Sequence, residues 1–160
     1  MRTSVLTVSC ALLALLLRAP AVAAQNIPVA EMATITALDC TFPVWTGTTW
    51  KEGVPDPQVR TSSTLSLRFD DIDTQDGLAR QAAGPGGEAE LVVQLYGWNL
   101  HLLDTNRAGR MAITTVFGQV SREGRLKAVH TRSDFIATEM GSFRSQPELA
   151  QYYGDCGVTR

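Results

Sequence analysis

Three β-type segments separated by short turns constrain the fold of this chain more than any other feature of its sequence. The segments cover residues 90–103, 111–120 and 125–136, and they are rich in β-branched and other apolar side chains. The loops between them contain Gly109 and Gly124, residues that suit tight turns. Strands that follow one another through short Gly-containing loops are typical of an antiparallel meander. We therefore expect the centre of the chain to form such a sheet.

The first half of the chain continues the β-type pattern. Apolar and polar residues alternate over residues 63–69, which is the spacing of a half-buried strand. Residues 33–50 are also rich in β-formers, with an interruption at Pro43. We expect residues 51–61 to form a loop, because this segment contains two prolines and a glycine.

The end of the chain changes to helical spacing. Ser145 and Glu148 have the spacing of a capping box. Leu149, Tyr152 and Tyr153 would share one face of a helix. We therefore expect a short helix of about two turns in this region.

The first 24 residues have the three parts of an export signal. The start is positively charged, residues 5–17 are mostly apolar, and small residues precede a cleavage site after Ala24, with Ala23 as the alternative. The apolar run is shorter than the ~20 residues that span a bilayer, which argues against an uncleaved anchor. We expect residues 1–24 to be a signal peptide and residues 25–160 to form a single mostly-β domain, located in the periplasm or outside the cell.

The chain has three cysteines. Cys10 falls in the predicted signal, which leaves Cys40 and Cys156 as an even pair in an oxidising compartment. Redox or metal chemistry is a weaker interpretation, because the sequence has no C-x-x-C motif and no histidine near either cysteine. We expect a disulfide that ties the start of the domain to its end. Such a link favours a closed barrel, in which the first and last strands meet.

Together these features predict an all-β fold, a small antiparallel β-barrel or sandwich with a short C-terminal helix. A small exported barrel with a terminal helix and a disulfide resembles the lipocalins and related calycins in architecture. The first motif of that family places glycine two residues before tryptophan on the first strand. Here Gly47 precedes Trp50 by three residues, and Gly97 is directly followed by Trp98. The resemblance therefore implies a fold and does not by itself imply a function.

The charge balance argues against some classes of partner. The chain carries 14 basic and 16 acidic residues, and Arg2 and Arg18 belong to the predicted signal. Nucleic acids and anionic membranes attract basic surfaces, so we expect neither as the main partner. After residue 30, charged or turn-forming residues interrupt every apolar stretch. We therefore expect no integral membrane segment in the mature chain.

The sequence contains no catalytic, phosphate-binding or metal-binding signature. The Gly-Ser pair at 141–142 lacks the second half of a nucleophile elbow, and residues 84–87 lack the lysine of a phosphate-binding loop. Aspartates cluster in residues 70–76, but a calcium loop beginning at Asp71 would have Ala82 in place of its last glutamate. We expect no catalytic residue, no metal and no cofactor, which favours a non-enzymatic protein over an enzyme.

His101 and His130 are the only histidines. If the lengths of the two hairpin loops set the register, His101 lies opposite about Ile113 and His130 opposite about Thr115. Positions of equal parity share one face of a sheet, so the two imidazoles would face the same side. Such a pair could hold a metal or transfer a proton. An enzyme that uses one of them as a general base is therefore a third, lower-ranked hypothesis.

Large amphipathic side chains are the candidate ligand contacts. They are Trp45, Trp50, Tyr96 and Trp98, together with His101 and His130. Aromatic side chains of this kind either complete a core or line a pocket. The leading hypothesis is a non-enzymatic, exported β-barrel protein that binds a small apolar or amphipathic ligand. The alternative is a cell-envelope or secreted protein-interaction module, such as an inhibitor or assembly factor. Its contact surface would be the basic hairpins at Arg107, Arg110, Arg122 and Arg125.

Overall fold

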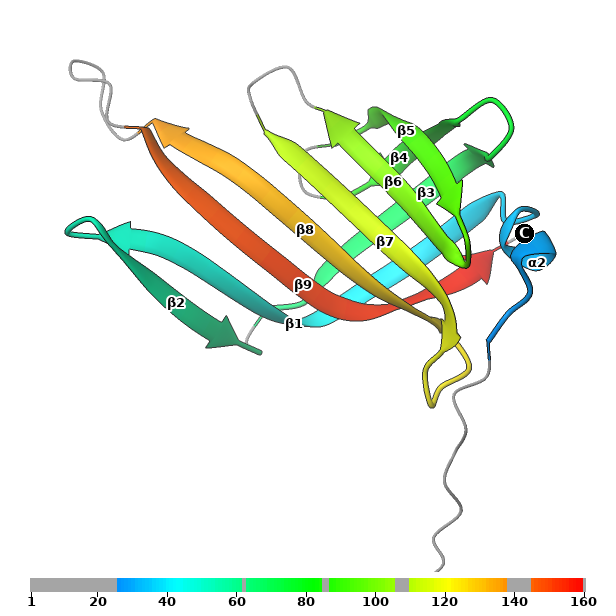
Figure 1. Cartoon of the computed structure of the whole chain (residues 1–160), viewed down its shortest axis with the longest axis horizontal. Helices are drawn as coiled ribbons and strands as arrows, with labels where there is room; N and C mark the ends of the chain where they lie inside the picture. The colour runs from blue at the N-terminus through cyan, green and yellow to red at the C-terminus, as the bar shows by residue number, and fades with distance from the viewer. Residues whose placement is uncertain (1–25, 62, 85–86, 106–109, 138–144, 160) are drawn as a thin grey trace, which may run out of the picture.

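The computed structural model describes residues 26–61, 63–84, 87–105, 110–137 and 145–159. Within these residues the chain forms nine β-strands and one short helix (Figure 1). The helix is α2 (Val29–Met32), and the strands are β1 (Ala37–Lys51), β2 (Val54–Arg60), β3 (Leu65–Asp73), β4 (Leu78–Ala83), β5 (Ala89–Tyr96), β6 (Asn99–Thr105), β7 (Met111–Val120), β8 (Leu126–Ala137) and β9 (Ser145–Thr159). Neighbouring strands pair antiparallel, in the order β2-β1-β3-β4-β5-β6-β7-β8-β9.

A closed barrel results because β1 also pairs with β9. The eight strands β1 and β3–β9 form the barrel, and β2 is attached to it as an extra strand. The predicted antiparallel barrel is confirmed, the sandwich alternative is wrong, and β5–β8 form the predicted meander. Closure joins the two edges that an open sheet would expose to other chains.

The second half of β1 leaves the barrel and pairs with β2 instead of β3. Glu52 and Gly53 form the two-residue turn between β1 and β2, and both have positive φ, as the twist of a tight hairpin requires. β8 and β9 also run past the barrel rim (Figure 1), so four strands, β8-β9-β1-β2, continue beyond it as one sheet. We call this sheet, residues 45–60 with 131–137 and 145–151, the extension.

Strand β2 corrects the expectation of a loop over residues 51–61. Pro55 and Pro57 have no N–H to donate, but β2 is an edge strand, and one side of an edge strand needs no donors. Pro55 and Pro57 are two residues apart, so their nitrogens point to the same side of the strand, which is the open side. They leave fewer free donors on this edge, which protects it from pairing with another chain.

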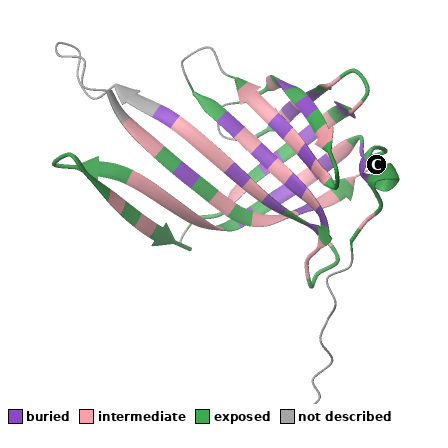
Figure 2. Ribbon diagram, viewed as in Figure 1, coloured by how far each residue is buried: buried purple, intermediate pink, exposed green. Residues whose placement is uncertain are grey.

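The barrel interior is apolar at the end where α2 lies (Figure 1). The inward side chains of several strands are almost fully buried there, including Leu38, Phe42, Phe69, Leu100 and Cys156. Met32 of α2 is fully buried against the same core. Figure 2 shows buried positions concentrated on the barrel strands, whereas the extension is mostly intermediate or exposed. The apolar core therefore fills the barrel and leaves the extension open to solvent.

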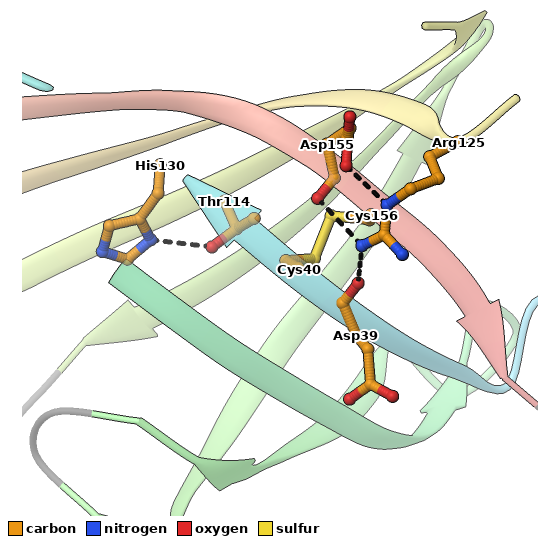
Figure 3. Close-up of a disulfide and its surroundings, with 7 residues drawn as sticks. All are labelled: Asp39, Cys40, Thr114, Arg125, His130, Asp155 and Cys156. Atoms are coloured by element: carbon orange, nitrogen blue, oxygen red, sulfur yellow. Dashed lines mark hydrogen bonds and ion pairs between the residues drawn. A yellow bond between two sulfur atoms is a disulfide. The ribbon is translucent and has the colours of Figure 1, made fainter. Parts of the chain in front are cut away.

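The seam between β1 and β9 carries the Cys40–Cys156 disulfide (Figure 3). The two cysteines occupy one register position of the ladder and lie at disulfide distance, as expected from the sequence. Arg125 lies beside them: its Nε donates to Asp155 Oδ1 at 2.5 Å, and its Nη2 donates to the carbonyl oxygen of Asp39 at 2.7 Å. A covalent bond and a charged hydrogen-bond network therefore hold the strands that close the barrel.

The predicted C-terminal helix is wrong, because residues 145–159 form strand β9. Ala150 and Cys156 are buried whereas Gln151 and Tyr153 are exposed, which is the period of a strand. The capping-box spacing is only a local preference. Pairing of β9 with both β8 and β1 outweighs it, as tertiary contacts commonly do.

Candidate functional site

The end of the barrel opposite α2 is polar. A pocket of about 60 Å³, which we call the mouth pocket, lies at this opening. Its wall combines apolar side chains with charged and polar ones from the ends of β3 to β8: Leu65, Leu67, Gln81, Glu88, Ala89, Asp104, Arg110, Ala112, His130 and Arg132. The mouth pocket therefore places polar groups directly above the apolar core.

His130 connects the mouth pocket to the core. Strand β8 presents it inward opposite Thr114, whose Oγ1 lies 2.8 Å from His130 Nδ1 (Figure 3). The side chain is only 7% exposed. Burial, reinforced by the charge of Arg132 and opposed by that of Asp134, lowers the pKa of His130 to about 4. The imidazole is therefore neutral at pH 7 and can make hydrogen bonds without carrying charge.

Two arginines share one carboxylate beside the mouth pocket. Arg110 Nε lies 2.7 Å from Asp134 Oδ1, and Arg132 Nε lies 2.6 Å from Asp134 Oδ2. The Asp134 side chain is 10% exposed, so little water competes for it. Burial raises the pKa of Asp104, which lies near the end of β6, and the charge of Arg110 opposes this change. When all four groups are ionised, their charges balance.

An aromatic wall leads from the mouth pocket to the extension. His130, Tyr152 and Trp45 occupy neighbouring register positions on β8, β9 and β1. The ring centroids of His130 and Tyr152 are 5.7 Å apart, and those of Tyr152 and Trp45 are 6.0 Å apart. The planes of Tyr152 and Trp45 differ by 29°, so the two rings are nearly parallel. The three rings form one continuous surface on the inner face of the sheet.

A second pocket, which we call the outer pocket, lies on the extension at the end of the aromatic wall. It has a volume of about 200 Å³, and β1, β2 and β9 supply its lining: Trp45, Gly47, Thr48, Thr49, Asp56, Gln58, Arg60 and Glu148. The guanidinium carbon of Arg60 lies 5.4 Å from the centroid of the Trp45 ring. Arg60 Nη2 also donates to Gln58 Oε1 at 2.5 Å. The outer pocket therefore has an aromatic floor and a polar rim.

Two of the six predicted ligand contacts belong to this region. Trp45 and His130 are part of the aromatic wall. Trp50 lies next to the turn between β1 and β2 and is 39% exposed. Tyr96 and Trp98 lie at the β5–β6 turn, at the α2 end of the barrel, and are 81% and 58% exposed. The last three residues therefore do not contribute to the two pockets.

His101, the remaining predicted contact, lies on the opposite face from His130. His101 pairs with Thr115 and His130 pairs with Thr114. Adjacent residues of β7 point to opposite faces, so the expected shared face is wrong. Both hairpins differ from the register that we expected. His101 pairs two residues further along β7 than Ile113, which keeps its face. His130 pairs one residue before Thr115, which changes its face. His101 Nδ1 instead lies 3.0 Å from Thr115 Oγ1, away from the barrel interior.

Of the four arginines in the predicted basic hairpins, two are ion-paired and a third, Arg122, is exposed. Arg110 is ion-paired with Asp134, and Arg125 is ion-paired with Asp155. Arg107, the predicted signal peptide and the 141–142 pair lie outside the described residues.

The region includes five residues outside the predicted set of ligand contacts: Arg110, Thr114, Arg132, Asp134 and Tyr152. Arg132 and Asp134 lie two and four residues after His130 on β8, so the alternation of a strand could have placed all three on one face. The helical spacing at the end of the chain predicts a helix for Tyr152, which would separate it from Trp45. Only the pairing of β9 with β1 brings these two rings together.

The described residues contain no group of three or more His, Cys, Asp or Glu side chains that could hold a metal ion. In the part of the chain that the structure describes, no helix has the length and apolar character needed to cross a membrane. A scan against protein-family models found no match, and no curated protein or solved structure is significantly similar to the chain. Membership of the lipocalins or calycins is therefore not confirmed.

Proposed function

We propose that the protein is an exported, non-enzymatic β-barrel protein that binds a small amphipathic ligand. The apolar part of the ligand lies against Trp45 and Tyr152, and a polar part reaches the mouth pocket. The observation that carries this proposal is the continuous ring surface, which runs from buried His130 to the open extension. Ligand sites commonly combine an aromatic surface with a few convergent polar groups.

Packing of the barrel favours this shallow placement over a deep one. Buried side chains fill the α2 end, and the mouth pocket has a volume of only about 60 Å³. Such a space can hold a small polar group or a few water molecules. A wholly apolar ligand would cover the charged groups around Asp134 without replacing their contacts with water. These features favour an amphipathic ligand over an apolar one.

Export and the absence of catalysis have separate support. A pKa of about 4 makes His130 a weak base at pH 7, and a general base works best with a pKa near the working pH. Its partner Thr114 is 2% exposed, so the hydroxyl is out of reach of a substrate. The predicted signal peptide and the Cys40–Cys156 disulfide are both typical of exported proteins.

Native mass spectrometry of protein purified from the exported fraction tests this proposal. We expect a chain without its signal peptide, carrying extra mass that is lost on denaturation. In vitro, the neutral fluorescent probe 1-anilinonaphthalene, in which an N–H group joins two aromatic ring systems, should bind the purified protein. Trp45→Ala should weaken this binding about tenfold, as expected for a lost aromatic contact. Tyr96→Ala is the matched control, because Tyr96 is exposed at the other end of the barrel. Equal binding by all three proteins would refute the site.

The α2 end of the barrel favours a second candidate function, the protein-interaction module. Tyr96 and Trp98 are exposed at the same turn, and large aromatic side chains anchor many protein interfaces. A partner captured from the exported fraction should then be lost when both residues are changed to serine. Retention of that partner by Trp45→Ala would separate this surface from the ligand site.

A further inference from the structure

The outer pocket has a flat aromatic floor. The Trp45 indole lies across Gly47, because a Cβ atom at Gly47 would overlap ring atom Cζ3 and would lie 3.1 Å from Cε3. One face of the indole is therefore against the strand, and the other is turned toward the pocket. The nearly parallel ring of Tyr152 continues this floor toward the barrel. Such a floor suits a ligand with a flat apolar face.

The rim of the outer pocket combines hydrogen-bond donors and acceptors. Asp56, Gln58 and Arg60 face Thr49, Gly47 and Trp45 in the β1–β2 register, so their side chains share the inner face with the indole. Glu148 completes the rim from β9. Carboxylate, amide and guanidinium groups can each bond two neighbouring hydroxyl groups.

The charges of both pockets argue against an anionic ligand. In the mouth pocket, Asp104 and Asp134 offset Arg110 and Arg132. Glu88, which also lines it, lies 4.0 Å from Arg80. In the outer pocket, two carboxylates face one guanidinium. A phosphate or carboxylate group would therefore find no excess positive charge in either place.

We propose that the outer pocket binds a neutral saccharide ring, an inference that rests on the proposed ligand-binding function. A sugar ring is amphipathic, because one face carries C–H groups and its edge carries hydroxyl groups. The C–H face stacks on Trp45 and displaces the Arg60 guanidinium, which is exposed and hydrogen-bonded to Gln58. The hydroxyl groups bond to Asp56, Gln58 and Glu148. Both the floor and the rim of the pocket are then used.

Isothermal titration calorimetry with maltose, cellobiose and N,N′-diacetylchitobiose tests the saccharide proposal. We expect at least one of these disaccharides to bind and to change the tryptophan fluorescence. Trp45→Ala should weaken that binding by about tenfold or more. Gly47→Ala is the sharper variant, because it keeps every side chain of the pocket while its methyl group displaces the indole. It should weaken binding to a similar extent, whereas Tyr96→Ala should leave it unchanged.

The alternative outcomes are distinct. Failure of all three disaccharides to bind would overturn the saccharide proposal, and so would binding that Trp45→Ala and Gly47→Ala leave unchanged. The anilinonaphthalene probe separates this failure from failure of the proposed function. Probe binding that depends on Trp45, without disaccharide binding, would overturn only the saccharide assignment. Absence of both kinds of binding would overturn both proposals.

Discussion

Replacing His130 with a side chain that does not titrate should flatten the pH dependence of stability. The imidazole is 7% exposed and hydrogen-bonded to Thr114. Burial lowers its pKa from the ordinary 6.5 to about 4. Asparagine at this position (His130→Asn) keeps a polar group near the place of Nδ1 but binds no proton. Comparing the wild type with this variant therefore isolates one proton-binding site.

The direction of the pH dependence follows from whether the folded or the unfolded state binds the proton at His130. Between pH 6.5 and about pH 4, the unfolded chain is protonated at His130 and the folded chain is not. The free energy of unfolding therefore falls as the pH falls through this range, and the contribution of His130 is complete only above pH 6.5. A tenfold difference in proton affinity corresponds to about 1.4 kcal/mol, so the loss reaches about 3 kcal/mol near pH 4.

Urea unfolding followed by tryptophan fluorescence, at several pH values between about 7.5 and about 4, measures this loss. We expect the wild type to lose about 3 kcal/mol more than His130→Asn over that range, because the carboxyl groups titrate in both proteins and cancel. The variant should be less stable at about pH 7.5, and the difference between the two proteins should shrink as the pH falls; this change is what the experiment tests. Parallel curves, or an NMR titration that places the His130 pKa near 6.5, would refute the reasoning.

Two further predictions concern the barrel seam. The disulfide closes a loop with a sequence separation of 116 residues, so replacing Cys40 and Cys156 with alanine should lower the free energy of unfolding by about 5 kcal/mol in urea titrations. A loss below about 1 kcal/mol would show that the disulfide removes little conformational entropy from the unfolded chain. Gly154→Ala should destabilise the protein by about 1–3 kcal/mol in thermal melts, because its Cβ would overlap the carbonyl oxygen of Thr41 on β1. Gly157→Ala is the comparison variant: its new methyl group meets the end of the Arg125 side chain, which can shift at the expense of its bonds to Asp155 and Asp39, whereas the Thr41 backbone is fixed in the strand ladder. We expect it to cost less than Gly154→Ala, and equal melting temperatures for the two variants would contradict this explanation.

Several parts of the fold were visible in the sequence because they depend on neighbouring residues only. The alternation of Leu65, Leu67 and Phe69 with polar residues marks β3, whatever lies beside that strand. The glycines of the turns mark the ends of the meander strands in the same way. The edge strand β2 was missed for a physical reason: its prolines oppose a strand inside a sheet but not at an edge.

The candidate site was predictable only in part. Trp45 and His130 were singled out because each is a large side chain with a polar group, a property of the residue itself. Their contact with Tyr152 was not predictable, because it depends on the pairing of β9 with β8 and β1. The balance of Arg110 and Arg132 against Asp134 likewise needs the register of β7 and β8.

The sequence by itself determined an antiparallel, all-β chain with a cysteine near each end of its domain, because side-chain alternation and turn residues act locally. The tertiary structure alone decided that residues 145–159 form a strand and that His130 faces inward while His101 faces outward. The physical reason is that hydrogen-bond register is set between segments far apart in the sequence. A shift of one residue in that register turns every side chain of a strand to the other face.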